Sequence, residues 1–280
     1  MILPWRNIVP ILKEYGANYV SFARHKNVRC ISHLHPMFEI VCVTKDRVKM
    51  TVDGKERNIQ EGQATIILPL QSHSFEEGAD SECMVCVFTE NFAESFCDKV
   101  GDSVPEEPVC ELGQSTLCYV NEVFSEDENI DRLVAQSILF PLCKEIYEKC
   151  SFFATVHHRD NAFIKAVEYT SKHFSEISGI SEAAKVIGVN SAYLSRVFKQ
   201  NSGHDYTYWL NCLKCSYAAQ MLVHRYPELN ISEIALAVGF GSIRSFNRVF
   251  REIFKMTPKE YIKQKSCFRY ESSFLSFSLQ

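Results

Sequence analysis

The clearest hydrophobic pattern in the chain is helical and lies in residues 230–251. One helical face gathers four apolar side chains at spacings of three and four: Ile231, Ile234, Ala235 and Val238. Asn230 and Glu233 form a capping-box pattern at its start, and Gly239 ends it, because glycine adopts the left-handed conformation cheaply. A second helix, beginning near Ser242, turns three apolar side chains inward: Phe246, Val249 and Phe250. The pattern predicts two short helices joined by a tight turn.

The outer face of the second predicted helix is basic. It carries Arg244, Asn247, Arg248 and Arg251. Arginine forks onto guanine and phosphate, and asparagine can bind adenine, so such a helix suits the major groove of DNA. For one hairpin alone, a solvated basic surface is an equally good interpretation.

A second copy of this pattern lies upstream. Residues 179–184 (Gly-Ile-Ser-Glu-Ala-Ala) match residues 230–235 (Asn-Ile-Ser-Glu-Ile-Ala), and the anchors Ala184 and Ala235 are 51 residues apart. Gly188 takes the place of Gly239, and a second helix is predicted over residues 191–199. A repeat constrains the whole architecture, so it favours a domain built from two helix-turn-helix units.

With this repeat, residues 160–264, about two-fifths of the chain, resemble the DNA-binding domain of the AraC/XylS family of bacterial transcription regulators. The matching positions are Ala184, Gly188, Tyr193, Leu194, Ser195, Arg196, Phe198, Lys199, Ala218, Leu222, Ile234, Ala235, Gly239, Phe240, Phe246, Arg248, Phe250, Thr257, Pro258 and Tyr261. Four positions depart from the family pattern: Lys255 for Gly, Lys214 for Arg, Ser245 for Tyr, and Gly241 at the usual Ser or Asp cap of the last recognition helix.

The resemblance implies which residues meet DNA. In the first unit, base edges or flanking phosphates would be met by Ser191, Ala192, Ser195 and Arg196. In the second unit, the same role would fall to Ile243, Arg244, Asn247 and Arg248. Lys199 and Arg251 would reach phosphate. A central helix over residues 206–224 would hold the two recognition helices about 34 Å apart, one turn of DNA. For any single residue the alternative is a solvated surface side chain.

The front of the chain has a different pattern, typical of short strands. Six apolar or alternating runs recur between residues 18 and 90: residues 19–24, 39–44, 47–52, 55–59, 64–68 and 84–88. Asp53 and Gly54 predict a tight hairpin between two of them. Many short strands at this spacing predict a small barrel or jelly roll.

This front region resembles the cupin-like sensor domain of AraC-family proteins, through His33, His35 and Glu39, then Gly62, Pro69 and His73. In metal cupins the matching positions hold an ion, which makes His33, His35, Glu39 and His73 metal candidates. Sensors of this family usually keep the barrel without a metal, so we expect no metal and no cofactor. We expect instead a small effector in the barrel mouth, bound by His35, Phe38, Glu39, His73 and Phe75.

Two helices are predicted next, over residues 115–124 and 129–150. The second carries an apolar stripe and should kink at Pro141: Ile130, Leu133, Val134, Ser137, Ile138, Leu142 and Ile146. The resemblance implies pairing of two subunits through this region; the alternative is that the stripe packs on the barrel. The predicted domains are residues 1–114 (sensor barrel), 115–154 (helical dimerisation and linker region), 155–265 (DNA-binding domain) and 266–280 (an unassigned tail).

Charge separates the two halves. Residues 1–154 hold 14 Lys and Arg against 24 Asp and Glu, whereas residues 155–280 hold 16 against 10. An acidic front and a basic rear fit a sensor joined to a nucleic-acid-binding domain. The chain shows no signal-peptide pattern and no apolar run of membrane-spanning length, so we expect a cytoplasmic protein. Its 12 cysteines are then expected as reduced thiols, and the pairs Cys83/Cys86 and Cys212/Cys215 as buried packing residues.

We therefore predict an α+β chain with a cupin-like barrel, following helices and an all-α domain of two helix-turn-helix units. The expected function is a sequence-specific transcription regulator: an effector-responsive activator that binds double-stranded DNA as a homodimer and meets RNA polymerase, with no membrane partner. It is not expected to be an enzyme. The alternatives are a metal-dependent cupin enzyme fused to a DNA-binding domain and an architectural protein with an empty barrel. A methyl-transferring repair regulator would need a cysteine-rich metal cluster near the front, which the spacing does not supply.

Overall fold

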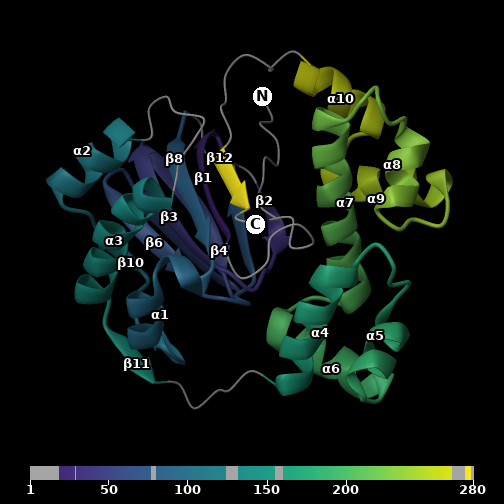
Figure 1. Ribbon diagram of the computed structural model, residues 1–280, viewed down its shortest axis with the longest axis horizontal. Coiled ribbons are helices and arrows are strands. Elements are labelled where there is room, and N and C mark those ends of the chain that lie inside the picture. The colour runs from purple at the N-terminus through teal and green to yellow at the C-terminus, as the bar shows by residue number, and fades with distance from the viewer. Residues whose placement is uncertain are drawn as a thin grey trace.

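The computed structural model describes residues 19–28, 30–76, 80–123, 132–154, 160–266 and 275–278 of the 280-residue chain. Figure 1 shows two bodies side by side, a sheet domain with its own helices and an all-helical domain. The chain passes from one to the other between Ala154 and Asp160. The predicted α+β organisation in two domains is confirmed.

The larger sheet of the front domain has six strands in the order β10-β6-β3-β8-β1-β12, with antiparallel neighbours. The strands are β1 (Tyr19–Lys26), β3 (Phe38–Lys45), β6 (Gln63–Ile67), β8 (Glu82–Phe88), β10 (Val109–Glu111) and β12 (Leu275–Ser278). The tail that the sequence left unassigned therefore supplies an edge strand, β12, which pairs with β1. All six strand runs predicted from the sequence are present in this sheet or in the smaller one.

The smaller sheet has four strands in the order β2-β7-β4-β5. They are β2 (Cys30–His33), β7 (His73–Glu76), β4 (Arg47–Val52) and β5 (Lys55–Gln60). Asp53 and Gly54 both have positive φ, 46° and 78°, and connect β4 to β5 as the predicted hairpin turn. The inner faces of the two sheets share one core, which includes Val41, Met50, Ile59, Phe75 and Val85.

The other face of the six-stranded sheet is covered by helices: η1 (Glu90–Phe92), α1 (Glu94–Val100), α2 (Gln114–Val123) and α3 (Arg132–Lys149). In α3 the buried side chains include Ile138, Leu142 and Ile146, which belong to the core that also contains Ile40 of β3. Most of the predicted stripe thus packs on the sheet, which was the alternative to dimerisation. Leu133 is an exception, with 76% of its surface exposed, and Ile130 lies outside the described residues.

Several short elements were not predicted. Residues 98–114, interpreted as a loop, contain the end of α1 and two three-residue strands, β9 (Ser103–Pro105) and β10. Strand β11 (Phe152–Ala154) pairs with β9, so residues 152–154 belong to the front domain rather than to a linker. Runs of three or four residues are too short to show a period of two, which is why the pattern missed them.

The helical domain has seven helices among its described residues, each formed where an apolar stripe meets a capping signal. They are α4 (Asn161–His173), α5 (Ile180–Ile187), α6 (Ser191–Ser202), α7 (Tyr206–His224), α8 (Ile231–Ala237), α9 (Ile243–Phe254) and α10 (Pro258–Ser266). One core joins them, with Phe198, Trp209 and Phe246 fully or almost fully buried. The pairs α5–α6 and α8–α9 are the two predicted helix-turn-helix units, with α7 between them.

Capping residues explain where these helices begin. Asn230 and Glu233 form the predicted capping box of α8: the Glu233 backbone N–H donates to Asn230 Oδ1 at 3.0 Å and the Asn230 backbone N–H donates to Glu233 Oε2 at 2.7 Å. The expectation that Gly241 takes the cap position of α9 is wrong. Ser242 takes it, since its Oγ accepts a hydrogen bond from the Ser245 backbone N–H at 3.2 Å.

The two Cys-x-x-Cys pairs are buried packing residues, as predicted. Cys83 belongs to the core between the sheets and Cys86 to the core beneath the helices, because residues three apart on a strand point to opposite faces. Burial raises the pKa of both thiols. Cys212 and Cys215 are buried in α7. In the part of the chain that the structure describes, no helix is both long and apolar enough to cross a membrane.

Candidate functional site

The first candidate DNA-reading face is the outer side of α6. Asn190 caps this helix by accepting hydrogen bonds from the backbone N–H groups of Ala192 and Tyr193, at 2.8 and 3.3 Å. The inner side buries Leu194, Val197 and Phe198. The predicted contact residues lie on the other side, with Ser191 half-buried and the rest exposed: Ala192, Ser195, Arg196 and Lys199. The 3.6-residue period therefore separates core and surface as the sequence predicted.

The second face is the outer side of α9, where all five predicted contact residues are exposed: Ile243, Arg244, Asn247, Arg248 and Arg251. Arg248 Nη1 lies 3.4 Å from Glu252 Oε2, and Lys199 Nζ on the first face lies 3.2 Å from Asp205 Oδ1. Exposed ion pairs of this kind contribute about 0–1 kcal/mol to stability. Both basic side chains can therefore leave their carboxylates for a phosphate or a base at little cost.

Lys214 of α7 connects the two units. Its side chain is 5% exposed, and Nζ donates to the Ile177 carbonyl at 2.9 Å and to the Gly239 carbonyl at 2.8 Å. Ile177 precedes the first helix-turn-helix unit and Gly239 lies in the turn of the second. Burial lowers the pKa of the Lys214 ammonium. One buried amine thus bonds to the backbone just before the first unit and to the turn of the second, a role that the sequence did not indicate.

The front domain contains a buried cluster of three histidines and one glutamate. His33, His35, Glu39 and His73 are each at most 3% exposed, and one ligand atom from each lies within 4.8 Å of the others. His35 Nε2 lies 3.1 Å from Glu39 Oε2, and His73 Nε2 lies 3.4 Å from the same oxygen. The four metal candidates named from the sequence are therefore brought together.

The charges in this cluster favour an anionic glutamate. Burial opposes ionisation of Glu39, but the charge of His73 and hydrogen bonds from His35 and His73 outweigh it and lower the pKa of the carboxyl. Burial lowers the pKa of His35. For His73 the effect of burial is overcome by the Glu39 carboxylate, which raises the pKa of His73. The cluster thus places a carboxylate where it attracts a positive charge.

The donor set fits a transition-metal ion. His73 Nδ1 lies 2.9 Å from the Gln71 carbonyl, which only accepts hydrogen bonds, so Nδ1 carries a proton. An arriving ion would displace the second proton of the charged ring from Nε2, which would then be the ligand atom towards Glu39. Glu39 Oε1 is buried and has no hydrogen-bond partner among the described residues. Two ligands of one ion, each about 2.1 Å away, are at most about 4.2 Å apart, so the cluster would close only slightly. Imidazole with carboxylate suits zinc, iron or nickel.

The predicted effector residues do not all meet. Phe75 lies in the core beside the cluster, with its ring 6.1 Å from the His73 ring. Phe38 lies on the opposite face of β3 from Glu39, because side chains alternate along a strand. It stacks on Phe88 at 5.5 Å and lines a different cavity, which lies between the domains. Placing Phe38 beside Glu39 in one pocket was therefore wrong.

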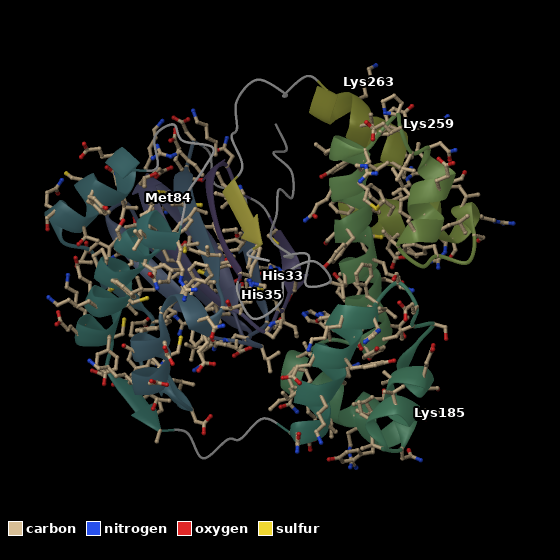
Figure 2. The ribbon with its side chains drawn as sticks, viewed as in Figure 1. His33, His35, Met84, Lys185, Lys259 and Lys263 are labelled. Atoms are coloured by element: carbon tan, nitrogen blue, oxygen red, sulfur yellow. The ribbon has the colours of Figure 1, made fainter. Side chains whose placement is uncertain are left out.

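The two domains contact each other directly beside the cluster. Ser32 Oγ lies 2.6 Å from His204 Nε2, and Trp209 Nε1 donates to the Leu34 carbonyl at 3.5 Å. Leu34 and Leu70 of the front domain belong to the core of the helical domain. Figure 2 shows His33 and His35 on the side of the sheet domain that faces α7. No motif in the sequence marked these contact residues.

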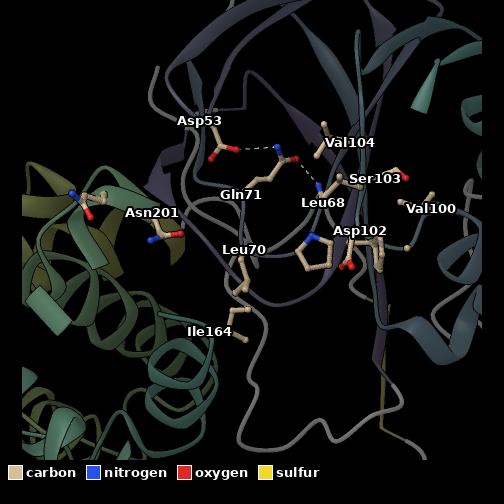
Figure 3. A pocket seen from close by; sticks show the side chains of 14 residues that line it. Asp53, Leu68, Leu70, Gln71, Val100, Asp102, Ser103, Val104, Ile164 and Asn201 are labelled. Atoms are coloured by element: carbon tan, nitrogen blue, oxygen red, sulfur yellow. Dashed lines mark hydrogen bonds between the residues drawn. The ribbon is translucent and has the colours of Figure 1, made fainter. Parts of the chain in front are cut away.

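A cavity of about 650 Å³ adjoins this contact, lined from the front domain by Phe38, Leu68 and Asp102 and from the helical domain by Ile164, Gln200 and Asn201. In Figure 3 the Leu70 and Ile164 side chains point toward one another across it. Asp53 and Gln71 form a hydrogen bond of 2.9 Å on its front-domain wall. Both domains thus contribute walls to one space.

Comparisons with known proteins agree with this architecture. Two family models match, the AraC-like ligand binding domain over residues 15–139 and the helix-turn-helix domain over residues 183–264. The HTH-type transcriptional activator RhaS of Enterobacter sp. (strain 638) is 23% identical over 241 residues, which cover 81% of this chain and 86% of RhaS. An uncharacterised HTH-type transcriptional regulator from Staphylococcus aureus is 32% identical over 102 residues, or 36% of this chain, and this chain spans only 13% of that protein.

Solved structures share the whole fold. An apo variant of ToxT from Vibrio cholerae has a TM-score of 0.61 at 14% identity, covering 90% of this chain and 98% of ToxT. Wild-type ToxT with a bound unsaturated fatty acid has a TM-score of 0.57 at 15% identity, covering 89% and 96%.

A ligand-binding sheet domain followed by two helix-turn-helix units defines a class of transcription regulators rather than enzymes. The chain belongs to the AraC/XylS family.

Proposed function

We propose that this protein regulates transcription by binding a specific DNA site through α6 and α9 and by responding to a small effector in its front domain. The observation that carries the proposal is the pair of exposed basic and polar faces on two helices that α7 joins into one body. Activation, contact with RNA polymerase and a cytoplasmic location belong to the same proposal. Its support for activation is the likeness to RhaS, an HTH-type transcriptional activator.

The two faces divide the work of recognition. Ser191, Ala192, Ser195 and Arg196 of α6 would meet one major groove, and Ile243, Arg244, Asn247 and Arg248 of α9 the next. Arginine pairs with guanine, asparagine with adenine, and the exposed Ile243 side chain suits a thymine methyl group. Lys199 and Arg251, toward the ends of the same faces, would neutralise phosphates.

We also propose that two copies pair through a face of α3 other than its buried stripe. Leu133, Phe140 and Tyr147, spaced seven residues apart, are 76%, 51% and 37% exposed. Residues seven apart lie on one side of a helix, so these side chains form an apolar row that a second copy could cover. Tyr119 of α2, 38% exposed, bonds to Ser137 of α3 at 2.7 Å and extends this row.

The effector site is proposed at His35, Glu39, His73 and Phe75, with the interdomain cavity at Phe38 as its neighbour. The ToxT structure that contains an unsaturated fatty acid supports a small-molecule effector for this fold. An effector acts by binding one arrangement of the two domains better than another.

The whole proposal is tested by selecting randomised DNA with the purified full-length protein. Enrichment of one site with two contact blocks about one helical turn apart is the expected result. Failure to enrich any site, with and without candidate effectors, would remove the proposed function.

We expect Arg248→Ala to weaken binding to the selected site by about 1–3 kcal/mol and to relax the base preference at one position. The substitution removes a guanidinium group that can donate two hydrogen bonds to a base edge. In the structure this group pairs with the exposed Glu252, a contact that contributes little to stability. Fluorescence anisotropy with labelled DNA measures the change. Lys165→Ala, which removes an exposed charge from α4 of the same domain, is the matched control and should keep full affinity. Equal losses in both variants would contradict the role of Arg248.

A further inference from the structure

We propose that the effector is a divalent transition-metal ion held by His33, His35, Glu39 and His73, and that the segments carrying these ligands pass its binding to the DNA-binding domain. The inference rests on the proposed function and assigns the class of its effector. Its first support is geometric: four buried donors from two segments, residues 33–39 and His73, converge within 4.8 Å.

The second support is the alternation of residues 32–35. His33 and His35 supply ligand atoms to the cluster. Ser32, which precedes His33, and Leu34, which lies between the two histidines, contact the helical domain. Side chains of an extended segment alternate in direction, so residues 32–35, at and just after the end of β2, present one side to the ion site and the other to the helical domain. A shift of this segment that brings its histidines onto an ion must also move Ser32 and Leu34.

The second ligand segment has the same arrangement. Ser72, next to His73, lies 2.9 Å from Ser32 through their Oγ atoms. Leu70 donates its backbone N–H to the His35 carbonyl at 2.8 Å and inserts its side chain into the core of the helical domain. Leu70 holds φ at +66°, a conformation that costs a non-glycine residue energy and persists where surrounding contacts impose it. Both segments therefore touch the ion site and the helical domain.

The contact points in the helical domain lie close to the DNA-reading parts. His204 follows α6, the first recognition helix, and precedes α7. Trp209 lies in the first turn of α7, the helix that joins the two units. Because Ser32 meets His204 and Leu34 meets Trp209, movement of the ligand segment acts on the junction of α6 and α7. The occupancy of the ion site thereby biases how the first recognition helix is presented.

Metal binding is tested on the full-length protein after chelator dialysis, by titration with Zn(II) and by metal analysis. We expect about one ion per chain, lost in Glu39→Gln and His73→Ala. Glu39→Gln keeps the size of the side chain, which guards against simple unfolding, and circular dichroism checks the fold of both. His173→Ala, at the exposed end of α4, is the matched control and should keep the ion. An ion that survives in both cluster variants would overturn the site.

Coupling is tested without DNA by Trp209 fluorescence in a Trp5→Phe background, which leaves Trp209 as the one tryptophan of the chain. Zn(II) has a filled d shell and does not undergo redox chemistry, so a spectral change reports the surroundings of Trp209 rather than electron transfer. We expect a saturable change that Ser32→Ala reduces at unchanged Zn(II) stoichiometry. Ser74→Ala, a half-buried serine on β7, is its control. An identical response in Ser32→Ala and the parent protein would overturn the path through Ser32.

Coupling to DNA is tested with the selected site. Zn(II) should change its affinity roughly 5-fold or more, and saturating DNA should change Zn(II) affinity by the same factor, because linkage is reciprocal. The effect should vanish in Glu39→Gln. A tightly bound ion with no effect on DNA affinity would make the cluster structural and overturn the inference, while leaving the proposed function intact. Absence of any selected DNA site, with Zn(II) still bound, would instead remove the proposed function and the effector role together.

Discussion

Gly239→Ala is expected to lower the free energy of unfolding of the helical domain by about 2–5 kcal/mol, the largest effect of a Gly→Ala change among the glycines that the structure describes. Gly239 has φ of +83°, where an L side chain is strained, and its added Cβ would lie 2.2 Å from the Ser175 carbonyl oxygen. The Cα and carbonyl carbon of Ser175 would be 2.8 and 2.7 Å away. Since all three neighbours are backbone atoms, the turn of the second unit must move.

Gly188→Ala separates the two causes. Gly188 occupies the corresponding turn of the first unit with φ of +77°, but nothing lies within 4 Å of its added Cβ. We expect this variant to lose only about 1–2 kcal/mol, from backbone conformation alone. The free energies of unfolding of both variants are measured by urea titration in the Trp5→Phe background, with Trp209 fluorescence as the signal. Equal losses at the two positions would show that the close approach to Ser175 does not matter.

Lys214→Met is expected to lower the free energy of unfolding of the helical domain by about 2–3 kcal/mol and to weaken binding to the full DNA site. The substitution leaves the carbonyls of Ile177 and Gly239 without their shared donor, and a buried polar group without a partner costs about 1–3 kcal/mol. Removal of a buried charge offsets part of this loss. Since Lys214 also lies 5.9 Å from the Phe240 ring, the turn of the second unit loses a cation–π contact as well.

Lys214→Arg is the matched control, because it keeps the charge and the donors. DNA affinity should be compared for the full selected site and for a site with only the block that α6 contacts. If Lys214 aligns the two units, Lys214→Met lowers affinity for the full site more than for the single block. Lys214→Arg should keep most of the unsubstituted protein's affinity for the full site. Equal losses on both sites would show that Lys214 stabilises the domain without aligning it.

The helical domain was predictable because its signals are local. The capping box of Asn230 and Glu233, the left-handed Gly239 and the 3.6-residue period all act within a few residues of sequence. The same period placed every proposed DNA contact on the outer faces of α6 and α9. The predicted cap of α9 was wrong by one residue. The family pattern placed it at Gly241, whereas the side-chain oxygen that caps the helix belongs to Ser242.

The front domain was predictable in kind but not in detail. Long strands such as β4 show alternation, whereas β2 and β7 are four residues each and rich in polar side chains. Those two short strands carry His33 and His73, so the part of the sheet with the weakest pattern holds half of the candidate site. Phe38 was placed beside Glu39 because they are neighbours in sequence, although neighbours on a strand face opposite ways.

The sequence alone determined the family, the two domains, the helix-turn-helix repeat and the side chains on the outer faces of α6 and α9 that we propose to contact DNA, because each follows from short-range periodicity or from a family motif. Tertiary structure decided which distant segments meet. It brought His73 to His33 across β2 and β7, joined Ile177 to Gly239 through Lys214, and set Ser32 and Leu34 against His204 and Trp209. Such contacts link residues tens to more than a hundred positions apart, and they arise from packing of whole elements, which no local pattern encodes.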